Sequence, residues 1–263
     1  VQDDTLSLAS VASPPVASSA TVKLFGSDHA GKVLPAYQGP TDLPNPLQPH
    51  MGHGKMALWL PPGNATTAPL ALGLAAPTAT GTATTRAVAV TNIATQQRRL
   101  GYVSAATAGS LSGYRNAAAQ FFRGGGAGLG GFHIMTRFVP SDAATVAGAR
   151  MFVGLWATTT APTNVETDTL VNMIGVGSRS TDTNLQFFYN DAAGTASAVD
   201  LGVNFPANGL SSDAYELTLY CEPNAADIFY RVENFITNAV AAGSVNTNIP
   251  ASTTLLGFQA YRS

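Results

Sequence analysis

The 263-residue sequence predicts an all-β fold: an antiparallel β-sandwich or jelly roll preceded by an extended, proline-rich N-terminal arm. Two observations support this prediction. Short runs of alternating apolar and polar residues recur in the second half of the chain, separated by turns rich in Gly, Pro, Asn, Asp and Ser. Charged residues make up only 11% of the chain, whereas surface helices usually carry many Glu and Lys residues.

The first half of the chain is expected to hold little regular structure. Residues 1–21 are rich in Ser, Ala and Pro without a strand or helix period, which indicates an extended arm or linker, either disordered or ordered by a partner chain. Residues 22–116 contain prolines that forbid long helices, so we expect an irregular particle-attachment segment with short strands, such as RAVAVTNIA at 86–94. One short helix over 106–119 is disfavoured by its glycines.

Residues 117–263 carry the strands of the predicted sandwich. In AYELTLYC (214–221), Tyr215, Leu217 and Leu219 share one face, which is expected to face the core. The other expected strands are GGFHIMTRFVP (130–140), ARMFVGLWA (149–157), LVNMIGVGS (170–178), NLQFFYN (184–190), VDLGVNF (199–205), DIFYRVEN (227–234) and LLGFQAYR (255–262).

Charge and composition exclude several classes of function. The net charge is −2 and no basic stripe exists, so a nucleic-acid partner is not expected. No apolar stretch approaches the roughly 18 residues of a spanning helix, so membrane insertion is not expected. The single Cys221 excludes an intrachain disulfide and a paired-cysteine zinc site, and it is expected to be a small buried apolar residue.

Motifs that could hold a cofactor or a metal are weak. A G-x-G-x-x-G match begins at Gly126, but a strand is expected after it where a dinucleotide site needs a helix, so a hinge or a close backbone approach is favoured. His50 and His53 could chelate a metal on a helix or on a threefold axis, but the flanking Pro and Gly oppose a helix. Arg98 and Arg99 could bind phosphate, although an interface or a solvated turn is favoured. We therefore expect no cofactor and no metal.

An enzymatic role has one candidate group of side chains. Two carboxylates about 5 to 10 Å apart can cleave a glycosidic bond. The carboxylates in question are Glu216, Glu222, Asp227 and Glu233, which are expected on outer faces of neighbouring strands. The outward aromatics Phe152, Trp156 and Tyr220 could stack on sugars, but subunit packing is the favoured explanation. The sequence therefore predicts that the chain is not an enzyme.

Long runs of the sequence carry a resemblance. They are LPAYQGPTDLPNPLQPHMG (34–52), PPGNATTAP (61–69), APTATGTATTR (76–86), RRLGYVSAATAGSLSGYR (98–115), GLGGFHIMTRF (128–138), SDAATVAGARMFVGL (141–155), APTNVE (161–166), LGVNFPAN (201–208) and TTLLGFQAYRS (253–263). Over about residues 20–263 the chain resembles a group of phage and prophage proteins identified as tail-fibre or virion structural proteins. Members usually continue past the final YRS with one more alternating strand.

The resemblance implies a structural component of a bacteriophage virion, located at the tail or the particle surface, with no transferable catalytic motif. A tail fibre that contributes to host-surface recognition is the leading expectation. Its partners would be two further copies in a homotrimer, other virion proteins and a bacterial surface receptor. The alternatives are a head-decoration or tail-connecting protein without receptor binding and, less favoured, a polysaccharide depolymerase.

If the chain is a fibre, its N-terminal half must bind the particle and the sandwich then faces outward. Receptor contacts are expected on loops, because a rigid β-scaffold carries binding there. The candidate loops are 158–168, 178–184, 190–198 and 206–213, whose polar residues suit sugar hydroxyls, although any one of them could be an ordinary solvated turn. The candidate contact residues are Thr163, Asn164, Thr181, Asp182, Asn184, Asn190, Asp191, Asn208, Ser211 and Ser212.

Overall fold

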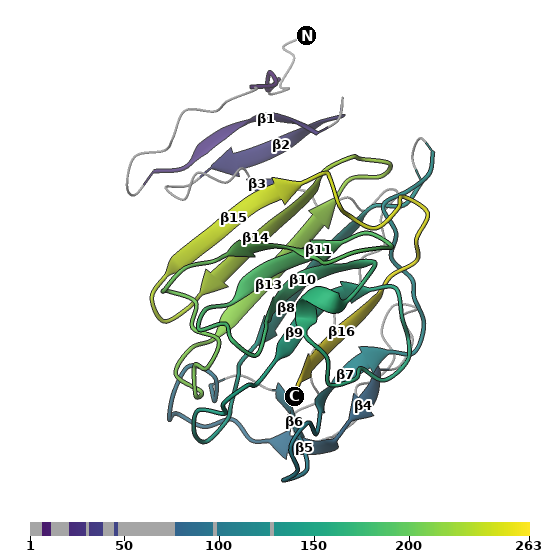
Figure 1. Cartoon of the computed structure of the whole chain (residues 1–263). Coiled ribbons are helices and arrows are strands. Elements are labelled where there is room, and N and C mark those ends of the chain that lie inside the picture. The colour runs from purple at the N-terminus through teal and green to yellow at the C-terminus, as the bar shows by residue number, and fades with distance from the viewer. Residues whose placement is uncertain are drawn as a thin grey trace.

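The computed structural model describes residues 7–11, 21–29, 32–38, 45–46, 77–96, 99–126 and 129–263. Within these residues the only helical element is a 3-10 turn, η1 (Thr167–Thr169), and the rest of the regular structure is strand. Two antiparallel sheets face each other and form a sandwich, as Figure 1 shows. The predicted all-β sandwich is therefore confirmed.

The larger sheet of the sandwich has seven strands. In spatial order they are β12 (Ser197–Asp200), β11 (Gln186–Asn190), β10 (Met173–Ser178), β9 (Met151–Trp156), β16 (Gly257–Arg262), β7 (Ser112–Asn116) and β4 (Pro77–Thr80). The smaller sheet has four strands, in the order β15 (Ala239–Val245), β14 (Ile228–Asn234), β13 (Tyr215–Cys221) and β8 (Phe132–Phe138). All neighbouring strands are antiparallel.

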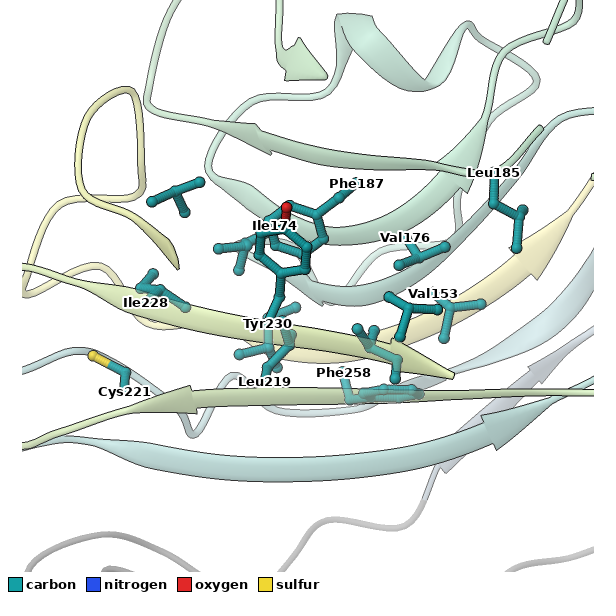
Figure 2. Close-up of a cluster of buried hydrophobic side chains, with 14 of the residues drawn as sticks. Val153, Ile174, Val176, Leu185, Phe187, Leu219, Cys221, Ile228, Tyr230 and Phe258 are labelled. Carbon is teal, nitrogen blue, oxygen red and sulfur yellow. The ribbon is translucent and has the colours of Figure 1, made fainter. Parts of the chain in front are cut away.

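The core lies between the two sheets, where alternate side chains of each strand meet. The rings of Phe187 on β11 and Tyr230 on β14 stack with centroids 3.8 Å apart, which joins the sheets at the centre (Figure 2). Leu217, Leu219 and Cys221 of β13 are fully buried, as their shared face predicted. Burial raises the pKa of the Cys221 thiol to about 12, so this group stays protonated and packs as an apolar side chain.

The outer face of the large sheet carries a second, smaller core. The segment from residue 157 to 172 leaves β9, crosses this face and returns to β10, and its Leu170 packs with Phe152, Phe188 and Tyr261. Hydrophobic strands with apolar residues on both faces need a cover on both sides. The cover keeps β9 and β10 buried along almost their whole length.

Strands from the first half of the chain also belong to the sandwich. β7 pairs with β16, and β4 pairs with β7. The sandwich therefore begins at residue 77, earlier in the chain than the expected start at 117. β4 and β7 extend the large sheet because their small residues pair in an antiparallel ladder. The segment 106–119 contains β7 and no helix.

Two further small sheets precede or flank the sandwich. A three-stranded sheet contains β1 (Lys23–His29), β2 (Lys32–Gln38) and β3 (Asn45–Pro46), and Ser10 of the arm forms a parallel bridge with Gly26. The hairpin of β5 (Thr82–Arg86) and β6 (Arg99–Val103) forms the other.

Two expected strands differ in the structure. RAVAVTNIA (86–94) contributes only Arg86 to β5, and the rest forms a loop in which Val90 is 95% exposed. The alternating valines of this segment meet no apolar surface among the described residues, so they remain exposed. VDLGVNF (199–205) ends as a strand at Asp200, because the carboxylate of Asp200 accepts the N–H of Gly202 at 2.8 Å and turns the chain.

Candidate functional site

Three of the four candidate loops meet at one end of the sandwich. Loop 158–168 contacts loop 178–184 through Glu166 and Ser180. Loop 178–184 contacts loop 206–213, because the N–H of Ala207 donates to the carbonyl of Thr183 at 2.9 Å. We call these three loops the loop cluster. They are far apart in sequence, and the antiparallel order of the strands brings them together.

Glu166 is the central anchor of the loop cluster. Its Oε1 accepts the hydroxyl of Ser180 at 2.6 Å, and its Oε2 accepts the backbone N–H of Ser180 at 2.9 Å. Arg150, just before β9, forms an ion pair with Oε1 at 2.7 Å and also donates to Oδ1 of Asn164 at 3.1 Å. Burial of Glu166 works against its ionisation, but the Arg150 and Ser180 contacts outweigh it and lower its pKa to about 2.

A second ion-pair group braces the same loops. Arg179 pairs with Asp182 at 3.1 Å and with Asp168 at 3.4 Å, and these contacts raise its pKa. Loop 206–213 is held by Arg262, which donates to Oδ1 of Asn208 at 2.6 Å and pairs with Asp142 at 2.6 Å. The loop cluster is therefore fixed by side chains on the strand ends rather than left to solvent.

The fourth loop, 190–198, lies at the other end of β11. Its first residue, Asn190, is 0% exposed, and its amide donates to the carbonyls of Leu170 at 2.8 Å and Gly194 at 3.2 Å. The expectation that Asn190 contacts a receptor is therefore corrected, because its side chain is used inside the protein. Asp191 is exposed, and its carboxylate accepts the N–H of Ala193 in a tight turn.

The remaining candidate residues divide by exposure. Asp182, Asn184, Asn208 and Ser211 are half-buried, and the carboxylate of Asp182 and the carbonyl oxygen of Asn208 already bind arginines. Those that are exposed on the loop cluster are Thr163, Asn164, Thr181 and Ser212. These four present hydroxyl and amide groups on a braced surface, which is suited to hydrogen bonding with a polar partner.

The four carboxylates considered for glycoside cleavage each have a structural contact. Glu216 pairs with Arg137 at 2.8 Å, and Glu233 pairs with Arg231 at 2.7 Å. Glu222 accepts the hydroxyl of Tyr220 at 3.0 Å, and Asp227 accepts the amide of Asn246 at 3.1 Å. Glu216 and Glu222 are buried, at 6% and 3% exposure.

The aromatics expected to face outward are covered within the chain. Phe152 is fully buried beneath segment 157–172, and Tyr220 is buried with its ring edge-on to His133 at 5.8 Å. Trp156 is half-buried and donates its indole N–H to the carbonyl of Val171 at 3.0 Å. Neither Phe152 nor Tyr220 is therefore available for stacking on a sugar.

The glycine run before β8 is a close backbone approach. A Cβ on Gly130 would lie 2.6 Å from the carbonyl oxygen of Arg123, and both Gly130 and Gly131 have positive φ. This bears out the structural explanation of the G-x-G-x-x-G match.

The described residues show neither a cluster of metal ligands nor a membrane-spanning helix. Across the described part of the chain, no three His, Cys, Asp or Glu side chains gather as metal ligands. His50, His53 and Arg98 lie outside the described residues. No described helix is long and apolar enough to cross a membrane.

The contacts of Glu166 predict that the folding stability of the chain depends on pH. The folded pKa of about 2 lies below the ordinary value of 4.5, so the anchor contributes fully above pH 4.5 and is lost as the pH falls towards 2. Glu166→Gln is expected to lower the free energy of unfolding by about 1 kcal/mol at pH 7, a value discounted for its partial exposure. Urea titrations at pH 7 and pH 3 measure this. An equal loss at both pH values would contradict the ionic origin.

Comparisons with known proteins give a likeness of fold only. No protein-family model matches the chain, and no curated protein matches it. Among solved structures it is similar to lectin II from Ulex europaeus, with 10% identity, a TM-score of 0.43, and coverage of 71% of this chain and 83% of that one. It is also similar to peanut lectin, with 11% identity, a TM-score of 0.43, and coverage of 80% and 90%.

Proposed function

We propose that the chain is a non-enzymatic structural component of a bacteriophage particle, a tail fibre whose sandwich contributes to recognition of the host surface. The observation that carries the proposal is the loop cluster: three polar loops are braced at one end of a rigid sandwich by Arg150, Arg179 and Arg262. The runs that resemble virion structural proteins extend through these same loops, at 161–166 and 201–208.

Substitution of the exposed hydroxyls tests recognition. Replacing Thr163, Thr181 and Ser212 together with alanine is expected to lower adsorption of the phage to host cells about tenfold, because even two lost hydrogen bonds of about 1 kcal/mol each suffice. Thr247→Ala is the matched control, since Thr247 is exposed at the opposite end of the sandwich. Unchanged adsorption of the triple variant, with normal particle assembly, would leave a purely structural role.

The position of the chain in the particle separates a fibre from the alternatives. An image of the intact particle in which this chain is traced is expected to place it in a fibre, with the loop cluster pointing away from the particle. A repeating position on the capsid would identify a head-decoration protein instead, and a position between tail segments would identify a connector. Clearing of host capsule by the purified chain would identify a depolymerase.

The expected assembly is a homotrimer, formed through the first half of the chain. Its support is the apolar surface of the three-stranded sheet, where Leu24 is 56% exposed and Val33 is 49% exposed. Small sheets of this kind need a partner to bury such side chains. Light scattering of the full chain should give three times the 27.0 kDa mass. A stable, folded monomer would contradict the assembly.

A further inference from the structure

A cavity of about 650 Å³ lies between the β5–β6 hairpin and the open side of the sandwich. One wall is the hairpin with its connecting loop, and the others come from β7 and β16 of the large sheet and β8 of the small one. In Figure 1 the hairpin lies beside the ends of β7 and β16. A volume of this size suits a ligand as large as a monosaccharide or disaccharide. Ser211 is the one candidate contact residue that reaches its lining.

Two arginines face each other at the hairpin end of the cavity. Arg86 of β5 and Arg99 of β6 are direct cross-strand partners, and both line the cavity. Like charges in this position destabilise a hairpin. The pKa of Arg99 is lowered, first by burial and then by the positive charge of Arg86. The guanidinium of Arg99 is held by the backbone carbonyls of Ala87 and Thr95, at 3.2 and 3.3 Å.

The described part of the lining offers Arg86 no counter-charge. Its two carboxylates are already engaged, since Glu216 pairs with Arg137 and Asp142 pairs with Arg262. The guanidinium of Arg86 forms no hydrogen bond or ion pair with any residue that the structure describes. A cation placed in this way at the wall of a cavity, beside a second cation, favours an anionic ligand.

Aromatic side chains form the wall next to the arginines. The ring of Tyr102 stacks on Tyr114 at 5.6 Å, and Tyr114 stacks on Phe258 at 5.5 Å, so the hairpin is anchored to the core through these rings. Burial raises the pKa of Tyr102 to about 12. The hydroxyl is neutral at physiological pH and can donate a hydrogen bond. A polar ring with an anionic substituent matches an aromatic wall beside guanidinium groups.

The backbone directs Arg86 along this wall. Arg86 lies across Gly101 of β6, where a Cβ would collide with its Nε. Gly81 turns the chain from β4 into the hairpin with φ of 71°, and a Cβ there would lie 2.9 Å from the carbonyl oxygen of Leu111. The two glycines therefore fix both the hairpin and the side chain that carries the unmatched charge.

From these contacts we infer that the cavity binds a sugar residue carrying a carboxylate or a phosphate, with the anion on Arg86 and Arg99 and the ring against Tyr102. The anion site follows from the cavity itself, whereas the choice of a sugar rests on the proposed function. A uronic acid and a sugar phosphate share the chemistry that the site recognises.

Calorimetry on the full chain with glucuronate, glucose 6-phosphate and glucose tests this inference. Both anionic sugars are expected to bind, at least about tenfold more tightly than glucose, and more weakly as salt rises. Whichever of the two binds more tightly identifies a carboxylate or a phosphate as the preferred group. Equal affinity for glucose and the anionic sugars would overturn the anion site. Equal affinity for acetate or inorganic phosphate would overturn the sugar assignment alone.

Variants at Arg86 localise the binding. Arg86→Gln is expected to weaken the binding of both anionic sugars at least about tenfold, while Arg86→Lys keeps part of it. The thermal midpoint of the Arg86→Gln variant should be unchanged or raised, because this variant removes the repulsion with Arg99. Arg231→Gln removes the same charge on β14, outside the cavity, and should bind normally. Undiminished binding by a folded Arg86→Gln variant would overturn the inference, whatever the adsorption assay of the loop cluster shows.

Discussion

Replacing Phe187 with alanine is expected to lower the free energy of unfolding by about 3–5 kcal/mol, the cost typical of a truncated buried aromatic. Phe187 is fully buried in β11, and its ring stacks on Tyr230 of the opposite sheet at 3.8 Å (Figure 2). The substitution therefore removes apolar contact from both sheets and leaves a cavity between them. Denaturant unfolding of the full chain, monitored by tryptophan fluorescence, measures the change.

Val199→Ala is the control for Phe187→Ala. Val199 is the cross-strand partner of Phe187 on β12, but it is 36% exposed at the sheet edge. Its truncation is expected to cost less than about 1 kcal/mol, because little apolar surface returns to water. If the two variants lost similar stability, the centre of the sandwich would not be the Phe187–Tyr230 contact.

Most strands of the sandwich could be predicted because their residues alternate and are large. β15 was missed, since AVAAGSV is built from small residues with low strand preference. Its conformation comes from a seven-residue ladder with β14, in which Val232 pairs with Ala241 and Phe229 with Ser244. The register of an edge strand depends on its partner, and the partner is not visible in a local pattern.

The buried outer face of the large sheet has a signal in the sequence. β9 and β11 carry large apolar residues on both faces: Val153 and Phe187 face the main core, whereas Phe152 and Phe188 face the opposite side. Such strands need cover on both sides. The alternation correctly placed Phe152 away from the main core. It could not reveal that segment 157–172 folds back over it, because that contact depends on a loop.

The loop cluster was only partly visible in the sequence. Polar composition identified Thr163 and Thr181, which are exposed, but it also selected Asn190, whose amide bonds inward. An asparagine amide binds water and a buried carbonyl equally well, so composition does not separate the two. The anchor pair of Arg150 and Glu166 was missed, because the two residues are joined by the path of the loop and not by a periodic spacing.

The approach of β9 to β10 predicts a large effect from one added methyl group. Gly154 and Gly175 are cross-strand partners at the centre of the large sheet. A Cβ on Gly154 would lie 2.6 Å from the Cα of Gly175 and would collide with the carbonyl oxygen of Ile174. These are backbone atoms that cannot rotate away, so the strands must separate. Gly154→Ala is expected to cost about 3 kcal/mol, at the upper end for overpacking.

Gly257→Ala isolates that effect from the general consequence of removing a glycine. Gly257 lies on β16, the other neighbour of β9, and the nearest atom to its added Cβ would be 3.4 Å away. The free energy of unfolding of the Gly257→Ala variant is expected to lie within about 0.5 kcal/mol of that of the natural chain. Urea unfolding of both variants makes the comparison, and hydrogen exchange adds the location, with faster exchange expected in β9 and β10 for Gly154→Ala alone. Equal stability of the two variants would mean that the β9–β10 ladder tolerates a side chain at this point.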